Sequence, residues 1–403
     1  MAVERVVVPA PPRGTRPRNR RALIVAAATE LFYRRGYDQL GMSDIAEAVA
    51  MGPSALYRHF AGKQDLLRTV IAEGFEPVHE VVNRLDLTDR PASLPWLATL
   101  ALDHRELGVL WQREARHMRQ ADVDALRGDL RAIARALTSR VLLAHPRLSP
   151  AAADLHAFST LAILMSTSFH HLDLPRPAYD ELVAEIVGAA LDTELAELPA
   201  APAQPAETPR LLPNSRREAL LAEAVRMFAR EGYTGVGIED IGAAVGIAGP
   251  SIYNHFPSKL DMLLTALNRG TAVLYMDLTT SLRTAADAPD ALRKLVASYV
   301  QFTLRHHDIV DLLITETEQL PADERHALRQ SQHDYISEWV RLLRIIHPQY
   351  DPTAARIRVH AAITVANDAA RTPHLRGNPA MAGALQALCA GILRLESRHP
   401  RRA

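Results

Sequence analysis

The sequence predicts an all-α protein built from two tandem copies of one unit. Residues 20–67 align without a gap with residues 216–263 at a constant offset of 196, and 19 of the 48 positions are identical. Residues 102–118 then align with residues 304–320 at an offset of 202. Apolar residues keep helical spacing in both copies, and prolines separate the helices. A period of this length corresponds to whole domains, because the repeats of solenoid proteins are far shorter.

Length and composition agree with two separate hydrophobic cores. The chain has 403 residues, of which 48% are hydrophobic. Its single cysteine, Cys389, cannot form a disulfide within the chain, so we expect a cytoplasmic protein. The N-terminus lacks the apolar stretch of a signal peptide, and the longest apolar run, residues 157–169, is too short for a bilayer. We therefore expect no membrane partner.

Each copy opens with a helix whose ends are marked in the sequence. Asn19 and Ser215 stand at the N-cap positions, and Ser215 with Glu218 matches the S-x-x-E capping box. Gly36 and Gly232 are expected to end these helices as C-cap glycines.

A second helix, a turn and a short third helix follow in each copy. The second helices are expected at 43–49 and 239–245, the turns at 50–52 and 246–248, and the third helices at 53–60 and 249–256. A helix of about two turns is not stable alone. Leu56 and Phe60, with Ile252 and Phe256 in the second copy, are expected to anchor it in the core. The opposite face then stays free, as a recognition helix requires.

These residues resemble the TetR/AcrR family of bacterial transcriptional regulators. The resemblance rests on L-F or M-F near the end of the first helix, then G-Y, D-I-x-x-A-V, P-S-A-L-Y-R-H-F or P-S-I-Y-N-H-F, and K-x-D-x-L. It implies that each copy joins a helix-turn-helix DNA-binding domain, here called a head, to a helical body. In the family the body binds a ligand and pairs with a second body. The resemblance implies a ligand-responsive repressor.

The resemblance also assigns positions that contact double-stranded DNA. Tyr57, His59 and Lys63, with Tyr253, His255 and Lys259, correspond to residues that grip phosphates. The groove-facing set comprises Pro53, Ser54, Ala55 and Arg58 in the first head and Gly249, Pro250, Ser251 and Asn254 in the second. Arg58 suits guanine and Asn254 suits adenine. Arg20, Arg21, Arg216 and Arg217 would lie near the DNA backbone.

The two heads differ in charge and share one departure from the family pattern. Residues 13–68 carry ten basic and five acidic side chains, whereas residues 209–264 carry six of each. Gly41 and Gly237 stand where the family usually has Thr or Ser, and Glu239 and Asp240 add acids near the second of these positions. The first head is therefore expected to supply most of the DNA affinity. An alternative is a small-molecule sensor or adaptor whose second head no longer binds DNA.

The bodies are expected to hold a small-molecule effector and to pair through their last two helices. Those helices are expected at 150–171 with 178–197 and at 352–370 with 379–396. Candidate ligand residues are Trp96, Trp111 and Glu114 in the first body and Tyr299, Phe302 and Glu316 in the second. For each aromatic residue ordinary core is the favoured alternative, and the two glutamates could equally face solvent.

Nothing in the sequence indicates catalysis. The clusters His170-His171-x-Asp173 and His306-His307-Asp308 lack metal-ligand spacing and are expected to be solvated. No phosphate-binding loop, dinucleotide-binding glycine pattern or nucleophile elbow occurs. We therefore expect no catalytic residue, metal or cofactor.

These observations divide the chain into six segments. We expect a disordered basic arm at 1–18, heads at 19–68 and 215–264, bodies at 69–198 and 265–403, and a Pro/Ala linker at 199–214. Two complete units on one chain are expected to form a pseudo-dimer whose heads lie about one DNA turn apart, ~34–36 Å. Because the groove-facing residues differ, the operator is expected to have two unlike half-sites. Further self-association stays open.

Overall fold

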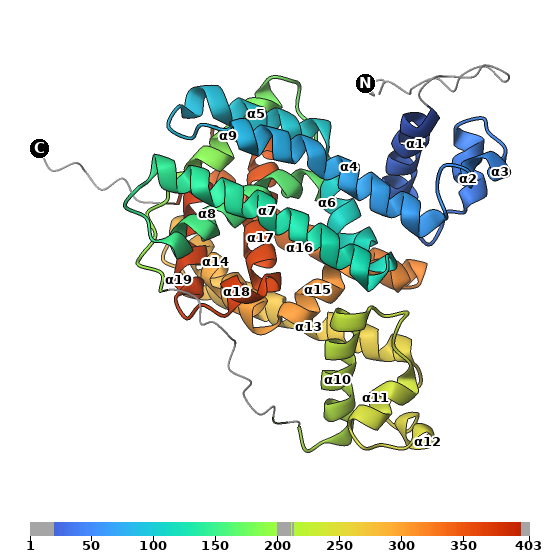
Figure 1. Ribbon diagram of the computed structural model, residues 1–403. Coiled ribbons are helices and arrows are strands. Elements are labelled where there is room, and N and C mark those ends of the chain that lie inside the picture. Colours follow the sequence, from blue (N-terminus) through green and yellow to red (C-terminus); the bar gives the residue numbers. More distant parts are fainter. Residues whose placement is uncertain (1–19, 200–210, 212, 396–403) are drawn as a thin grey trace, which may run out of the picture. The chain divides into compact units, whose positions relative to one another are not determined.

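A computed structural model describes residues 20–199, 211 and 213–395 of the protein (Figure 1). All regular elements in these ranges are helices, so the predicted all-α fold is confirmed. None of these helices is long and apolar enough to cross a membrane. Asn19, the N-terminal arm and most of the linker lie outside the described residues. The chain forms two compact units, one up to Arg84 with Asp103–Ile133, and one of Leu85–Leu102 with the residues from Ala134 onward.

The first unit contains the first head. Its elements are α1 (Arg20–Arg35), α2 (Met42–Ala48), α3 (Pro53–Leu56), α4 (Lys63–Arg84), α6 (Leu107–Val109), the single turns η1 (Leu110–Glu114) and η2 (Ala115–His117), and the start of α7 (Gln120–Ala144). Helix α1 packs against α2 and α4, because its apolar stripe of Ile24, Ala28 and Phe32 is completely buried. Gly36 follows α1 with φ of 76°, as expected for a C-cap glycine.

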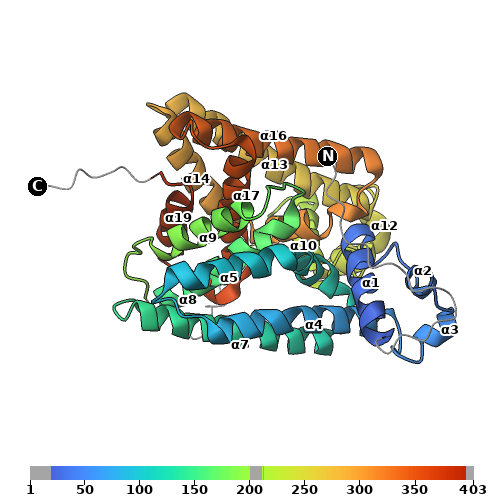
Figure 2. The same cartoon turned by 90° about the horizontal axis from the view of Figure 1, so that it is seen from above.

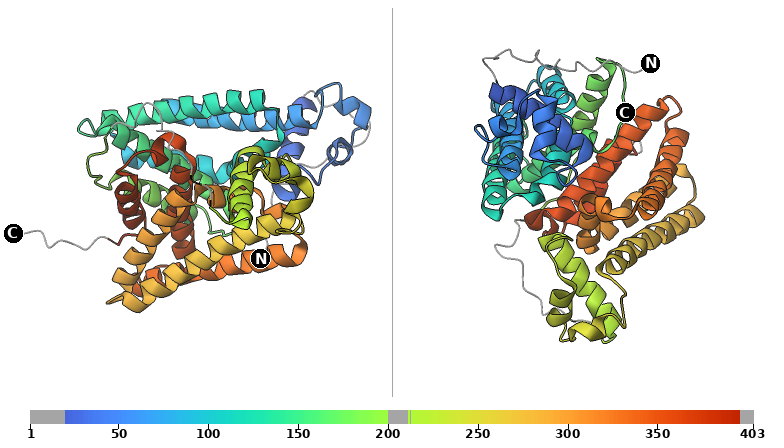
Figure 3. Two further views of the ribbon diagram at one scale, coloured as in Figure 1. Left: turned by 90° about the horizontal axis from the view of Figure 1, so that it is seen from below. Right: turned by 90° about the vertical axis from the view of Figure 1, so that its right-hand side faces the viewer.

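The second unit contains the second head and the second body. The head comprises α10 (Arg216–Glu231), α11 (Ile238–Ala244) and α12 (Gly249–Ile252), and the body continues with α13 (Lys259–Thr284), α14 (Ala288–Arg305), α15 (His307–Thr315), the turn η4 (Thr317–Gln319) and α16 (Ala322–Ile346). One apolar core joins Leu220, Phe228 and Phe256 of the head to Leu263 of α13 and Leu312 of α15. The long helices α13 and α16 lie side by side (Figure 2, Figure 3).

Helices from both halves of the sequence meet in the second unit. The first half supplies α5 (Arg90–Asp103), α8 (Pro150–Ser166), the turn η3 (Thr167–Phe169) and α9 (Ala178–Leu191), and the second half supplies α17 (Pro352–Arg371), α18 (Pro373–Arg376) and α19 (Met381–Ile392). Helix α8 packs against α17, and α9 packs against α17 and α19 (Figure 1). Ala153 and Ala157 of α8 and Ala362 and Ala366 of α17 are buried. We call the contact of α8 and α9 with α17 and α19 the pairing interface.

Two local expectations about the heads were wrong. Ser215 is the N-cap residue of α10, but its side chain accepts no capping hydrogen bond, and the expected capping-box partner Glu218 instead binds Arg269 of α13. The third helices are single turns, α3 and α12, and hydrogen-bonded turns carry the chain on to Phe60 and Phe256. Tertiary contacts rather than helix length therefore hold this segment.

The expectation that His170 is solvated was also wrong. His170 is buried, and its ring lies 4.9 Å from the ring of His360 of α17. The sequence could not indicate this burial, because the segment after α8 becomes covered only when the second half of the chain packs onto it.

Candidate functional site

The third helix of each head presents one exposed face. In the first head the exposed residues are Pro53, Ser54, Tyr57, Arg58 and His59, and Ala55 is half-buried. In the second head the exposed residues are Pro250, Tyr253 and Asn254, and the half-buried ones are Ser251 and His255. The large rings of Tyr57 and Tyr253 are 56% and 52% exposed. Leu56 and Phe60, like Ile252 and Phe256, are buried beneath this face. We call these exposed surfaces the reading faces.

A tight turn before each third helix sets the direction of the reading face. Ala50 and Gly246 occupy equivalent positions and both have positive φ, 53° and 71°. The next residues close the turns, as the N–H of Met51 donates to the carbonyl of Ala46 and that of Ile247 to Gly242, each at 2.8 Å. Positive φ suits glycine and strains alanine, so the first head stores strain at Ala50 that the second head avoids.

Lys63 and Lys259, predicted to grip phosphates, are bonded within the protein. The ammonium of Lys63 donates to the carbonyls of Tyr37 and Leu40 at 2.9 and 2.8 Å and lies 3.8 Å from the Tyr37 ring centre. Lys259 repeats this with Tyr233 and Val236 at 2.7 and 2.8 Å. Burial lowers the pKa of both amines. Each lysine thus ties the start of the body's first helix to the loop after the head's first helix, with one N–H left of its three.

The glycines that replace the usual hydroxyl residue still start a helix. The N–H of Gly41 donates to the carboxylate of Asp44 at 2.6 Å, and the N–H of Gly237 donates to Asp240 at 2.9 Å. The aspartate three residues on therefore caps the backbone from within α2 or α11. Asp240 has this structural role in the second head, whereas the neighbouring Glu239 is simply exposed.

The arginines at the start of the first helices also lie against the protein. The guanidinium of Arg21 pairs with Glu73 of α4 and lies 5.5 Å from the centre of the Phe60 ring. The guanidinium of Arg217 lies 4.3 Å from the centre of the Phe256 ring. Arg216 is exposed and Arg20 is half-buried. Arg21 and Arg217 therefore pack against the buried phenylalanines that follow the third helices.

Glu114 and Glu316, considered as ligand residues, lie instead where each head meets its own body. Both carboxylates are buried. The N–H of Tyr37 donates to Glu114 Oε2 at 2.8 Å, and the ring of Tyr37 stacks 4.7 Å from His117. Glu316 lies beside Gly232, and its charge raises the pKa of Lys259, although burial lowers that pKa more strongly. Each glutamate thus sits at the C-terminal end of its head's first helix.

The four aromatic ligand candidates separate into two pairs. Trp96 is exposed on α5, and Trp111 meets Phe75 edge-on within the first unit at 5.6 Å between ring centres. Tyr299 and Phe302 are buried on α14. The hydroxyl of Tyr299 bonds to the amide oxygen of Asn367 at 2.8 Å. The structure therefore brings the second pair, and not the first, into one core.

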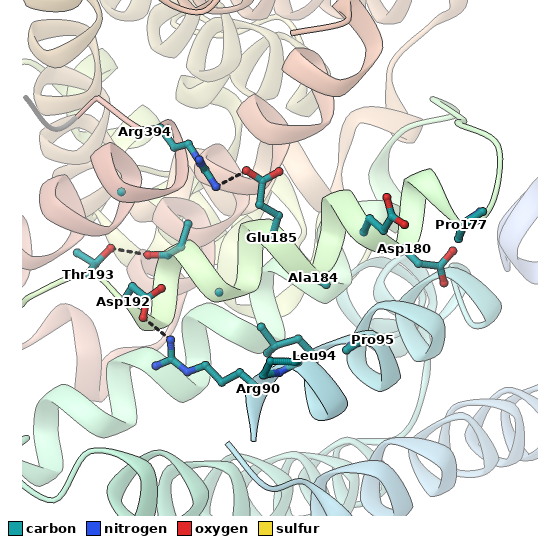
Figure 4. A pocket seen from close by; sticks show the side chains of 15 residues that line it. Arg90, Leu94, Pro95, Pro177, Asp180, Ala184, Glu185, Asp192, Thr193 and Arg394 are labelled. Carbon is teal, nitrogen blue, oxygen red and sulfur yellow. Dashed lines mark hydrogen bonds and ion pairs between the residues drawn. The ribbon is translucent and has the colours of Figure 1, made fainter. Parts of the chain in front are cut away.

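A pocket of about 930 Å³ lies between α5, α9 and the residues around the end of α19 (Figure 4). Its apolar wall includes Leu94, Pro95 and Ala184. Arg90 pairs with Asp192 and Arg394 pairs with Glu185, whereas Asp180 and Glu181 are further acids in the lining. None of the sequence-predicted ligand residues lines it. No cluster of three or more metal-ligating side chains occurs in the described part of the chain.

In the ion pairs across the pairing interface, the acid always comes from the first half of the chain and the base from the second half. Glu185 of α9 binds Arg358 of α17 at 2.9 Å and also pairs with Arg394, and Asp154 of α8 binds His374 at 2.8 Å. Arg358 is 1% exposed, and it also donates to the carbonyl of Ile392 at 2.9 Å. The first half supplies the acids and the second half the bases. None of these residues was predicted from the sequence, although Arg358 lies on a helix whose neighbouring positions Ile357 and Val359 are apolar.

Comparison with known proteins agrees with the geometry of the heads. Residues 24–70 and 220–266 each match the family described as bacterial regulatory proteins, tetR family. The chain is 34% identical over 93 residues to the HTH-type transcriptional activator FasR of Mycolicibacterium smegmatis, covering 23% of this chain and 42% of that one. It is 35% identical over 107 residues to the HTH-type transcriptional repressor NicS of Pseudomonas putida, covering 25% and 47%. The chain thus spans less than half the length of these two relatives.

Solved structures of similar chains are also found. The ketosteroid transcriptional regulator KstR2 of Mycobacterium tuberculosis matches with a TM-score of 0.41 and 23% identity, over 46% of this chain and 97% of that one. A TetR-family transcriptional regulator from Bordetella parapertussis matches with a TM-score of 0.40 and 22% identity, over 46% and 99%. The two matched segments, the helix-turn-helix geometry and the offset alignment agree. The chain carries the DNA-binding domain of the tetR family of bacterial regulatory proteins twice, at residues 24–70 and 220–266.

Proposed function

We propose that this chain is a DNA-binding transcriptional regulator that responds to a small molecule and whose two halves pair with each other. The observation that carries the proposal is the repeated reading face, with Tyr57 in one head and Tyr253 in the other held outward by buried anchors. Exposed aromatic and polar side chains on a short, firmly anchored helix suit contact with a DNA groove. A gel shift with the DNA flanking the gene is the first test, and no shift at low salt would refute it.

Pairing of unlike halves is supported by the charges at the pairing interface. At the offset of 202, Glu185 corresponds to Ala387 and Arg358 to His156. Two second halves paired in the same way would bury Arg358 without a carboxylate, which is costly. Two first halves would leave Glu185 without Arg358. The interface therefore favours a first half against a second half, as in a pseudo-dimer.

The two reading faces differ in the side chains that suit base edges. Arg58 and Asn254 occupy equivalent, exposed positions. Arginine suits guanine and asparagine suits adenine, so the operator would have two unlike half-sites. Selection of binding sites from random duplex DNA tests this directly. Recovery of a perfect palindrome would mean that two chains contribute identical heads, and it would contradict the pseudo-dimer.

A second candidate is a sensor or adaptor in which only the first head binds DNA. It is favoured by exposed Glu239 and Asp240 beside the second reading face, where they repel phosphates. Comparison of Tyr253→Ala with Tyr57→Ala in the full chain separates the two candidates. The regulator with two active heads loses affinity in both variants, whereas the adaptor loses it only in Tyr57→Ala.

A further inference from the structure

The first head is attached to its body through a contact centred on one histidine. His117 lies in η2, which packs against α4, while the preceding turn η1 packs against α1. The ring of His117 stacks on the ring of Tyr37 in the loop after α1, with 4.7 Å between ring centres and 12° between ring planes. The side chain of His117 is only 13% exposed. We call this contact of Tyr37 with His117 the first head–body contact.

Two acids and one arginine face the ring nitrogens of His117. Nδ1 lies 3.6 Å from a carboxylate oxygen of Asp38, and Nε2 lies 3.9 Å from one of Glu114. The Nε–H of Arg116 donates to Nε2 at 3.4 Å. These contacts fit a neutral imidazole that carries its proton on Nδ1, because Nε2 must keep its lone pair to accept from Arg116.

A second proton on His117 would make this contact unfavourable. It would occupy Nε2, so that the N–H groups of His117 and Arg116 would point at each other. Another cation is already close, since the ammonium of Lys63 lies 3.8 Å from the centre of the Tyr37 ring. A charged imidazole would therefore stack on a ring that Lys63 also contacts.

The two acids do not offset this effect. Glu114 already binds Arg113, and the side chain of Asp38 is about half exposed, so that water screens its charge. Burial lowers the pKa of His117 most and Arg116 lowers it next, whereas the two acids raise it by less. The closed contact thus binds a proton less tightly than a free imidazole does. It should weaken as the pH falls below about 6.5, the ordinary pKa of histidine.

The second unit has side chains that do not titrate at the corresponding positions. In the alignment of the two copies, Asp38 corresponds to Thr234 and His117 to Gln319. The lysine contact is kept, because Lys259 binds its loop carbonyls as its counterpart does. Attachment of a head therefore does not require the histidine, which adds a pH-dependent group to the first head alone.

The turn before the histidine is also irregular in the first unit. The carbonyl of Leu110 accepts from the N–H of Ala115, five residues later, so η1 is a π turn. In the second unit the carbonyl of the corresponding Leu312 accepts from Glu316, four residues later, as in an α-helix. Single π turns within helices are rare and often lie at functional sites. This placement favours a role for the first head–body contact beyond packing.

We propose that His117 makes DNA binding by the first head sensitive to acid, because protonation of its ring opens the first head–body contact. While the contact is closed, the body holds the loop after α1 and thereby supports the reading face of the first head. When the contact opens, the head loses this support and the chain binds DNA more weakly. The second head, which has Gln319 instead, keeps its attachment in acid. This inference rests on the proposed DNA-binding function, and it adds the proton as a signal beside the small molecule.

DNA affinity measured at several pH values tests the proposal. The probe is a fluorescein-labelled duplex recovered by selection from random DNA, and fluorescence anisotropy gives Kd from about pH 8 down to about pH 5.5. His117→Gln introduces the residue of the second unit, and comparing the two chains at each pH cancels the effect of other histidines such as His59. The ratio of the original Kd to that of His117→Gln should rise by roughly 2- to 10-fold towards pH 5.5, which lies about one unit below the ordinary pKa of histidine. A constant ratio would overturn the proposal.

Asp38→Asn provides a second variant whose effect has an expected sign. It removes an acid that favours the charged ring, so the loss of DNA affinity on acidification should become steeper. A shallower loss would mean that the ion pair of Asp38 with charged His117 closes the contact in acid, and the proposal would be wrong. The matched control is His79→Gln, which lies about 24 Å further along α4 than Lys63 and should keep the pH profile of the original protein.

Hydrogen exchange at the Tyr37 amide reports opening of the first head–body contact without DNA. This N–H donates to Glu114 at 2.8 Å, so opening exposes it to exchange. Relative to His117→Gln at the same pH, the original protein should exchange this amide faster in acid than at neutral pH. Loss of DNA binding at every pH would refute the proposed function, whereas a pH-independent exchange ratio at Tyr37 would refute the opening of the contact. The two failures are therefore distinguishable.

Discussion

Glu185 is the residue whose loss should most weaken the pairing interface. Its carboxylate binds Arg358, which is 1% exposed, and Arg394 at the surface. Glu185→Gln keeps the size of the side chain and removes its charge. Breaking a buried ion pair by removing one partner costs about 3–5 kcal/mol. Two features lower this figure: Arg358 keeps its bond to the carbonyl of Ile392 and its position 5.1 Å from the Tyr350 ring centre, and the Glu185 side chain is 38% exposed.

We therefore expect Glu185→Gln to lower the free energy of unfolding by about 2–3 kcal/mol. For a large domain each kcal/mol lowers Tm by about 2–4 °C, so we expect Tm to fall by roughly 4–12 °C. Calorimetry or circular dichroism measures this fall. Glu181→Gln is the matched control. It lies one turn away on α9, is exposed and has no ion-pair partner among the described residues, so its effect should stay within about 0.5 kcal/mol.

A double variant separates buried charge from simple loss of contact. Glu185→Leu with Arg358→Leu removes both charges, and it should be clearly more stable than Glu185→Gln because no uncompensated charge remains. If Glu185→Gln and Glu181→Gln melt at the same temperature, the ion pair contributes nothing and the reasoning fails. If the double variant is less stable than the single one, the guanidinium of Arg358 is needed for a reason other than its carboxylate partner.

Three further outcomes are expected. Burial lowers the pKa of His156 to about 4, so the folded state disfavours its protonation. The free energy of unfolding, measured in urea, should therefore fall as the pH drops from 6.5 towards 4, by about 2 kcal/mol at pH 5. His156→Phe should remove that part of the pH dependence. Ala50→Gly should stabilise the protein by up to about 1 kcal/mol, because glycine adopts positive φ without strain, while Gly246→Ala should destabilise it by about 1 kcal/mol. A loss of stability in Ala50→Gly, or a gain in Gly246→Ala, in denaturant titrations would contradict the claim that Ala50 is strained. Tyr57→Ala should cost more DNA affinity than Tyr253→Ala, because the first head carries more basic than acidic side chains; equal losses in gel shifts would show that net charge does not decide which head binds DNA more tightly.

The heads could be predicted closely because their signals are local. Glycine after the first helix, an apolar pair in the third and the turn between them all act over a few residues. Their consequences, a C-cap at Gly36 and buried Leu56 and Phe60, follow from the nearest neighbours. Two details were wrong. The capping box of Ser215 with Glu218 does not form, because Glu218 binds an arginine of another helix. The third helices are shorter than expected, since periodicity does not distinguish one helical turn from a turn that continues by other hydrogen bonds.

The partners of charged side chains could not be predicted in this way. Lys63 has the position of a phosphate contact, but the carbonyls that it binds belong to a loop more than twenty residues away. Glu114 contacts Tyr37, and Arg358 contacts Glu185, across much larger separations. No pattern along the chain encodes which helices will bring such groups together. The alignment of the two copies supplied the best clue, because it shows which charges change between equivalent positions.

The contact between α8 and α17 has a consequence for how much protein a cell needs. Both helices belong to one polypeptide, so their association is intramolecular and proceeds at an effective concentration on the order of millimolar. Two separate subunits would come apart when only a few copies are present, and occupancy of DNA would then rise with the square of expression. A chain that carries both partners stays assembled at any copy number. Its occupancy should rise in simple proportion to gene dosage, and subunits of related proteins would have no free partner to exchange with.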